Sequence, residues 1–212
     1  MDLRKAIEEI KKEAGKRKFK QTVEMKINLS GIDPKGFSIN DVIELPKGIK
    51  KERKICAVGT GDFILKAKKC ADKVIDSKTF GKFDKKEKKK IAREFDFFIV
   101  EAPAMAEFAK NFGPILAPRG KMPNPQHIVP PGGNPCPIIE KARRSVRVVA
   151  KKSPVVHAVI GTEDMGVEEL EENAKAVLEH VISKLPRGKQ NIKSIYIKLT
   201  MSRAVKVSGQ GK

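Results

Sequence analysis

The sequence predicts an α/β protein in which both ends of the chain form one α+β domain and the middle forms a second, inserted α/β domain. Two alternating segments far apart in sequence, Thr22 to Leu29 and Ser194 to Ser202, predict strands of one antiparallel sheet. Between them, short apolar runs alternate with helical segments, which favours a small parallel sheet. The two end strands would then share one basic surface beside the chain termini.

These patterns place residues 1–49 and 152–212 in the discontinuous outer domain and residues 50–151 in the inserted domain. Pro46-Lys47-Gly48 marks the first crossing between the two, because proline and glycine interrupt regular elements. The charged segment Lys50 to Lys54 would serve as the linker.

The outer domain should begin with a helix from about Asp2 to Ala14, whose apolar residues recur at helical spacing and which Gly15 ends. A strand over residues 22–29 follows, and Asp41 to Leu45 forms another. In the first strand the predicted core face is Val23, Met25, Ile27 and Leu29, and the solvent face is Thr22, Glu24, Lys26 and Asn28.

The inserted domain should open with Ile55 to Gly59, a continuous apolar run typical of a buried parallel strand. Its further predicted elements, in chain order, are a helix to about Lys69, a strand at Val74-Ile75, a helix over Lys85 to Arg93, a strand over Phe97 to Val100, a helix over Ala104 to Phe112, and a helix and strand over Ile138 to Val149.

A proline-rich segment precedes the last predicted helix and strand of the inserted domain. Nine of the 13 prolines lie from Pro103 to Pro137, which predicts a long ordered loop in place of continuous helix or central strand. Arg119 and Lys121 project from this loop. They are either a secondary RNA or phosphate contact or solvated charges on a fixed loop, and the sequence does not separate the two.

The chain then returns to the outer domain. Pro154 to Gly161 predicts a strand, and Val167 to Leu185 predicts an amphipathic helix that Pro186-Arg187-Gly188 ends. The last long strand passes through Ile195 and Leu199. Ala204 to Val207 extends it or pairs with it.

The net charge indicates the class of partner. Forty-five Lys and Arg against 26 Asp and Glu give a formal charge of +19 and a pI of about 9.9. Such a balance favours a polyanion, because phosphate contacts release condensed counterions. The alternative is a merely basic surface of thermophilic type. No apolar stretch reaches the ~20 residues needed to cross a bilayer and no signal peptide is apparent, so we expect a cytoplasmic protein that binds no membrane.

Side-chain patterns give little support for catalysis. Gly59-Thr60-Gly61 lies between a strand and a helix, where phosphates are often bound, but it lacks the spacing of a dinucleotide or Walker motif. No nucleophile–base pattern is visible, and His127, His157 and His180 are scattered, each by default a satisfied structural histidine. We therefore expect no enzyme, cofactor or metal. The alternative is a nucleotide-using enzyme with a phosphate site at the Gly59 turn, and a DNA-compacting protein is a third possibility.

The spacing of the three cysteines gives no sign of a disulfide framework. Cys56, Cys70 and Cys136 are odd in number, widely spaced and outside any CxxC motif. We expect free, partly buried thiols in a reducing compartment.

Three segments together resemble a known family. GPILAPRGKMPNP at residues 113–125, TVEMKINL at residues 22–29 and KLTMSRAVKV at residues 198–207 are similar to the L-one family of large-subunit ribosomal proteins, archaeal branch. The resemblance runs over essentially the whole chain. It implies that the inserted domain is Rossmann-like without binding a dinucleotide.

The resemblance also implies partners. It implies binding of large-subunit rRNA at the mobile stalk near the tRNA exit site of the ribosome, assistance in releasing deacylated exit-site tRNA, and repression of translation through binding of the protein's own mRNA. The free protein would be a monomer.

The resemblance assigns the RNA surface to the outer domain, through Phe19, Glu24, Thr200, Met201 and Ser202. We expect Thr22, Lys26, Lys198 and Arg203 to belong to the same surface. A negatively charged side chain is unusual on a surface that binds RNA. It is explained if Glu24 accepts a hydrogen bond from a ribose 2′-OH. Ser202-Arg203 replaces the Gly-Pro usual in the family, and serine hinders the close backbone approach that glycine allows.

Overall fold

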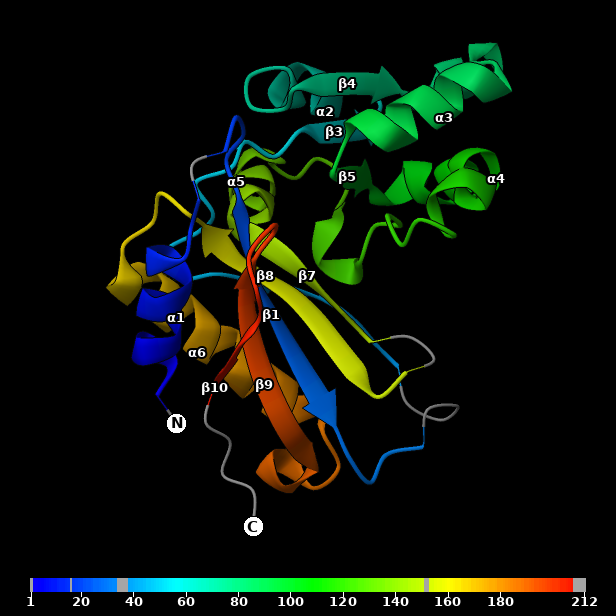
Figure 1. Cartoon of the computed structure of the whole chain (residues 1–212). Coiled ribbons are helices and arrows are strands. Elements are labelled where there is room, and N and C mark those ends of the chain that lie inside the picture. The colour runs from blue at the N-terminus through cyan, green and yellow to red at the C-terminus, as the bar shows by residue number, and fades with distance from the viewer. Residues whose placement is uncertain (1, 16, 34–37, 151–152, 208–212) are drawn as a thin grey trace. The chain divides into compact units, whose positions relative to one another are not determined.

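The computed structural model describes residues 2–15, 17–33, 38–150 and 153–207. The chain divides into two compact units (Figure 1). Unit 1 comprises Met1–Lys51 and Arg144–Lys212, and unit 2 comprises Glu52–Arg143. One unit contains an antiparallel sheet and the other a parallel sheet, so the predicted α/β class is confirmed. The predicted second boundary, at residues 151 and 152, lies outside the described residues.

Unit 1 is built on a six-stranded antiparallel sheet with strand order β10-β9-β1-β8-β7-β2. In chain order its strands are β1 (Thr22–Leu29), β2 (Ile39–Glu44), β7 (Ser145–Ala150), β8 (Val155–Thr162), β9 (Ile192–Leu199) and β10 (Val205–Val207). The two end strands, β1 and β9, are direct neighbours, as the sequence predicted.

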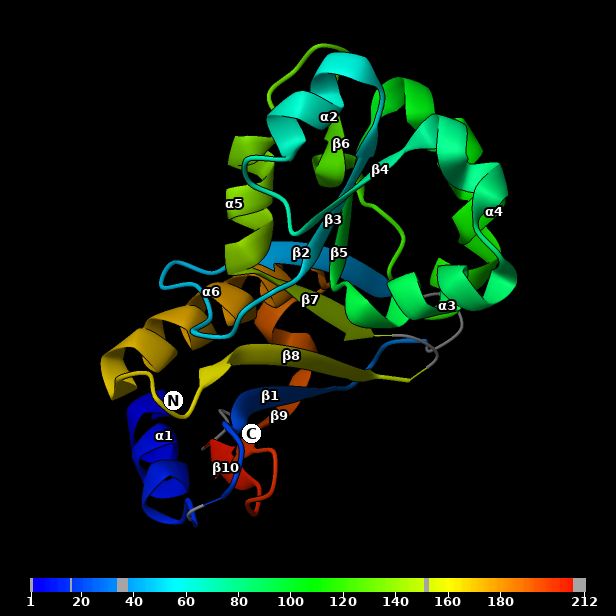
Figure 2. The same cartoon turned by 90° about the horizontal axis from the view of Figure 1, so that it is seen from above.

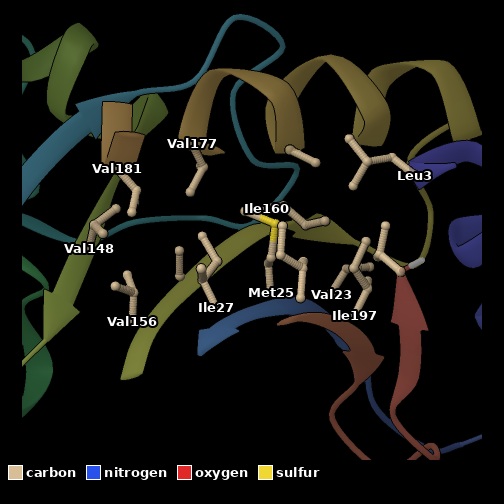
Figure 3. Packing of buried hydrophobic residues seen from close by; sticks show 14 of the residues in the cluster. Leu3, Val23, Met25, Ile27, Val148, Val156, Ile160, Val177, Val181 and Ile197 are labelled. Atoms are coloured by element: carbon tan, nitrogen blue, oxygen red, sulfur yellow. The ribbon is translucent and has the colours of Figure 1, made fainter. Parts of the chain in front are cut away.

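Helices α1 (Leu3–Lys12) and α6 (Val167–Lys184) pack on one face of this sheet, and a short 3₁₀ helix, η4 (Gly188–Asn191), leads into β9. Alternate strand residues such as Met25 and Ile27 meet Val177 and Val181 of α6 in a closed apolar core (Figure 3). Burying one face of each strand leaves the opposite face of the sheet for polar residues. The fold therefore produces the polar strand surface directly from the alternating pattern.

Strand β7 corrects one prediction. The sequence pattern favours placing residues 145–149 in the inserted domain, but β7 pairs with β2 from Ile39↔Ala150 to Glu44↔Ser145 and adjoins β8. Val146, Val148 and Ala150 are buried in the core of unit 1. This alternation is typical of an antiparallel strand with one covered face, and it differs from the continuous apolar runs of unit 2.

Unit 2 contains a four-stranded parallel sheet with order β4-β3-β5-β6 (Figure 2). Strands β3 (Ile55–Gly59) and β5 (Phe97–Glu101) are buried at every position, as expected for the centre of a covered parallel sheet. The other elements are the strands β4 (Lys73–Asp76) and β6 (Ile128–Val129), the helices α2 (Gly61–Ala67), α3 (Lys85–Glu94), α4 (Met105–Leu116) and α5 (Cys136–Arg144), and the 3₁₀ helices η1 (Ser77–Lys82), η2 (Ala102–Ala104) and η3 (Pro125–His127).

The proline-rich segment is more regular than predicted. Helix α4 continues to Leu116 through Pro114, and β6 adds a strand parallel to β5. Pro114 lies in the last turn of α4, where the missing N–H removes a single hydrogen bond, while the buried Phe112 and Leu116 anchor that turn. The two-residue β6 lies at the sheet edge, where nearby prolines are tolerated.

The expectation of three free thiols is wrong for two of them. Cys70 and Cys136 form a disulfide with a Cα–Cα distance of 5.7 Å. They are 66 residues apart, and only the fold brings them together. Cys56 is a free, buried cysteine, and burial raises the pKa of its thiol to about 12. None of the helices in the described part of the chain is long and apolar enough to span a membrane.

A buried asparagine fixes the segment where the chain first leaves unit 1. Asn173 of α6 is fully buried, its Oδ1 accepts from the Lys47 N–H at 3.0 Å, and its Nδ2 donates to the carbonyls of Gly48 and Ile160 at 2.9 Å each. We predict that Asn173→Ala lowers the free energy of unfolding by about 2–3 kcal/mol, because two buried backbone carbonyls and one partly buried N–H lose their partner. Urea denaturation measures this change. The control Asn40→Ala, at an exposed position of β2, should change stability by no more than ~0.5 kcal/mol, and equal effects would contradict the assignment.

Candidate nucleic-acid interface

The pairing of β1 with β9 forms the centre of the candidate surface (Figure 1). Glu24 lies directly across from Lys198, and Lys26 lies across from Tyr196. Residues directly opposite in an antiparallel pair point to the same side of the sheet. Since Val23, Met25 and Ile27 are buried beneath the helices, these four side chains belong to the open face.

The strand register extends this open face beyond the residues predicted from sequence. Lys206 of β10 and Lys26 of β1 each pair with Tyr196, and Lys26 also pairs with His157 of β8. Lys26, His157 and Lys206 are exposed and Tyr196 is half-buried. His157 therefore lies on the open face of the sheet and not in the core. Its alternating strand already contained the signal, because His157 falls between the buried Val156 and Ala158.

A turn at the end of β9 is fastened to the start of β1. The Thr200 N–H donates to the Thr22 carbonyl at 3.1 Å, and the Thr200 hydroxyl accepts from the Thr22 N–H at 3.1 Å. The same hydroxyl lies 3.3 Å from the Thr22 carbonyl, to which it donates. Thr200 therefore has a structural role in addition to any contact with a ligand. Its removal should disturb the corner as well as the surface.

A residue that the sequence analysis missed supports this turn. Gln21 is 2% exposed, its Oε1 accepts from the Met201 N–H at 3.2 Å, and its Nε2 donates to Glu163 Oε2 at 3.1 Å. Buried polar groups are costly unless they are paired, so this bridge holds the turn after β9 to the turn after β8. Nothing local in the sequence distinguishes Gln21, because both partners are distant along the chain.

Two large apolar side chains, Phe19 before β1 and Met201 in the turn after β9, are exposed to solvent. Phe19 is 50% exposed and Met201 is 60% exposed. Ser202 closes the turn, since its Oγ accepts from the Leu199 N–H at 2.9 Å and donates to the Arg203 carbonyl at 2.9 Å. Arg203 is exposed beside it. The serine hydroxyl is thus used within the turn, while exposed apolar and cationic groups face outward.

Glu24 is available as a hydrogen-bond acceptor. Among the described residues it forms no ion pair within 4 Å, although Lys198 lies directly across from it. Glu24 is therefore not an ordinary strand residue paired to a lysine. Because an ionised carboxylate only accepts hydrogen bonds, the unpaired Glu24 can accept one from a donor group of a ligand.

The two cations of the proline-rich segment separate in the structure. Lys121 is half-buried, and its Nζ donates to the Phe95 carbonyl at 2.6 Å, immediately after the end of α3. A lysine at this position satisfies a backbone group that the helix leaves open. Arg119 is exposed. Lys121 therefore stabilises unit 2, and the pair does not form one basic patch.

The Gly59 turn is closed to phosphate. Glu101, at the end of β5, is 6% exposed, and its Oε2 accepts from the N–H and the hydroxyl of Thr60 at 2.9 and 3.1 Å. A carboxylate of the protein thus occupies both Thr60 donors, and its charge would repel a phosphate. This geometry overturns the alternative of a nucleotide site at this turn.

The fold and the basic sheet face define the class: a two-unit α/β protein with a cationic strand surface suited to nucleic acid. The model of the Ribosomal protein L1p/L10e family matches residues 7–203, and the chain belongs to this family. The predicted resemblance is confirmed, and the family is one of ribosomal proteins, not of enzymes.

Archaeal relatives match nearly the whole chain. The chain is 44% identical to the large ribosomal subunit protein uL1 of Thermococcus kodakarensis over 208 residues, covering 95% of this chain and 94% of the relative. The uL1 proteins of Archaeoglobus fulgidus and Thermoplasma volcanium are 43% and 41% identical, and each alignment covers 95% of the relative and at least 96% of this chain.

Gly59 has a packing role that a substitution can test. A Cβ at Gly59 would lie 2.3 Å from Phe63 Cδ1 and 2.9 Å from Glu101 Oε2, whereas a Cβ at Gly81 would meet nothing within 4 Å. We predict that Gly59→Ala lowers the free energy of unfolding by about 1–3 kcal/mol through overpacking, and that Gly81→Ala changes it little. Urea denaturation with and without ATP measures both effects. A tolerated Gly59→Ala, or stabilisation by ATP, would contradict the closed turn.

Proposed function

We propose that this protein is a cytoplasmic component of the large ribosomal subunit that binds rRNA through the open face and corner of unit 1. The observation that carries the proposal is the β1–β9 pairing, which gathers Thr22, Glu24, Lys26 and Lys198 on one face. The same pairing places the corner at Thr200 to Arg203 beside the start of β1. Family membership and the uL1 relatives support rRNA as the partner.

The chemistry of this surface favours RNA over DNA. Lysines and Arg203 attract phosphates of either nucleic acid. Because of these contacts, the logarithm of the affinity should fall linearly with the logarithm of the salt concentration. Glu24 supplies the discrimination, because its carboxylate accepts from a ribose 2′-OH that DNA lacks. Phe19 and Met201 add exposed apolar surface against which sugars or bases can lie.

We further propose that the rRNA site is the mobile stalk beside the exit site, where the protein assists the release of deacylated tRNA. In the same proposal the protein acts as a free monomer that represses translation of its own mRNA. A single RNA surface supports this regulation: an mRNA that imitates the rRNA site competes for the same side chains. When rRNA is scarce, free protein then binds the message.

Glu24→Ala tests the proposal through the sign of its effect. Removing a negative charge from a polyanion-binding surface should tighten purely electrostatic binding. The proposal predicts the opposite: Glu24→Ala should weaken binding to a stalk-like rRNA fragment roughly tenfold, since one hydrogen bond to a charged acceptor is lost. Calorimetric titration of the wild type and variant with the rRNA fragment measures this difference. The DNA duplex of the same sequence should bind more weakly and should not respond to the substitution.

Glu44→Ala is the matched control, because Glu44 is an exposed carboxylate on β2, at the opposite edge of the same sheet. It should leave rRNA binding unchanged or slightly tighter. Binding of Glu24→Ala that equals or exceeds that of the wild type would refute the role of Glu24. Equal affinity for the RNA and the DNA would refute the proposed RNA specificity.

A further inference from the structure

Helix α5 is fastened to one short segment of unit 2 near both of its ends. At the beginning of the helix, Cys136 is covalently bonded to Cys70, which follows α2. Near its end, the Arg143 guanidinium donates to the Cys70 carbonyl at 3.1 Å and to both carboxylate oxygens of Asp72 at 3.2 Å. The segment at residues 70–72 therefore contacts α5 near both ends, and between them Ile139 and Ala142 of the helix are buried.

The two attachments differ in chemistry. The Arg143 end is non-covalent and also includes the Arg53 carbonyl, to which the guanidinium donates at 3.0 Å. At the Cys136 end, one further contact to α2 is an exposed hydrogen bond from Lys66 Nζ to the Gly132 carbonyl at 3.0 Å. Exposed contacts of this kind contribute little. Cleavage of the disulfide would thus remove the covalent attachment at the beginning of α5, while the Arg143 contacts at its end remain.

The disulfide encloses most of unit 2. The 66-residue separation between its cysteines includes β4, α3, β5, α4 and β6. A cross-link over a loop of this length restricts the unfolded chain strongly. Both cysteines are partly exposed, in contrast to the buried Cys56, so a reductant can reach the bond.

We propose that the Cys70–Cys136 disulfide is a redox-responsive clamp that fixes the beginning of α5 and sets the stability of unit 2. Reduction takes two electrons and two protons from a dithiol reductant, which is itself oxidised to a disulfide, and yields two thiols. Re-formation is the reverse thiol–disulfide exchange with a small-molecule disulfide as oxidant. The inference does not rest on the proposed RNA function, because both cysteines belong to unit 2 and the candidate RNA surface belongs to unit 1.

The state of the bond in cells is the first test. Cells that produce the full chain are quenched in acid and alkylated with N-ethylmaleimide before lysis, and tryptic peptides are mapped by mass spectrometry. The proposal expects Cys56 to be alkylated and a substantial fraction of Cys70 and Cys136 to appear as one linked peptide. Complete alkylation of Cys70 and Cys136 would overturn it.

The response to reductant is the second test. Dithiothreitol should lower the thermal unfolding midpoint of the wild type by about 10 °C or more, given the loop length. Cys70→Ser and Cys136→Ser should each start near the reduced value and not respond. Cys56→Ala, whatever its own stability, should respond as the wild type does. An unresponsive wild type, or a serine variant that responds equally, would overturn the clamp, and affinity for the rRNA fragment should be the same in both redox states.

Discussion

The antiparallel pairing of β1 with β9 is the interaction on which the rest of unit 1 depends. It joins residues 22–29 to residues 192–199 across an insertion that contains all of unit 2. Closing so large a loop has an entropic cost that grows slowly with length, so a well-packed pairing can sustain it. Met25, Ile27, Ile195 and Ile197 provide that packing under α1 and α6. The same alternation that buries these residues exposes the polar set on the other face.

At the turn after β9, some residues use their polar atoms within the protein and their neighbours remain exposed. Thr200, Gln21 and Ser202 use their polar atoms within the protein, and together they fix the turn after β9. Met201 and Arg203 of the same turn are exposed, and Glu24 lies nearby on the open face of β1. A surface held in this way loses little conformational freedom on binding, which favours affinity and specificity together. Thr200 is bonded to Thr22 within the protein, so its substitution would test the proposed RNA contact less cleanly than that of Glu24.

Much of the fold was predictable from sequence because its signals are local. Strict alternation identified β1, continuous apolar runs identified β3 and β5, and one apolar stripe identified α6. The errors arose where distant residues decide the outcome. The partner of β7 depends on β2, the disulfide depends on how α2 and α5 pack, and the importance of Gln21 depends on two turns far away in sequence. The sequence around Gly59 could not reveal that the turn is closed, because the carboxylate that occupies it, Glu101, comes from another strand.

The most direct test of an RNA surface on unit 1 is to measure the affinity of each unit separately for rRNA. One chain joins residues 1–51 to residues 144–212 through a short linker and so retains β7, which lies between β8 and β2 in the sheet. The other comprises residues 52–143 alone. After urea denaturation shows that each is folded, both are titrated with a stalk-like rRNA fragment beside the full protein. If unit 1 carries the RNA surface, the joined chain should bind within about threefold of the full protein, a difference of less than ~1 kcal/mol, and residues 52–143 should bind only weakly. If residues 52–143 carried the affinity and the joined chain did not, the assignment of the RNA surface to unit 1 would be contradicted.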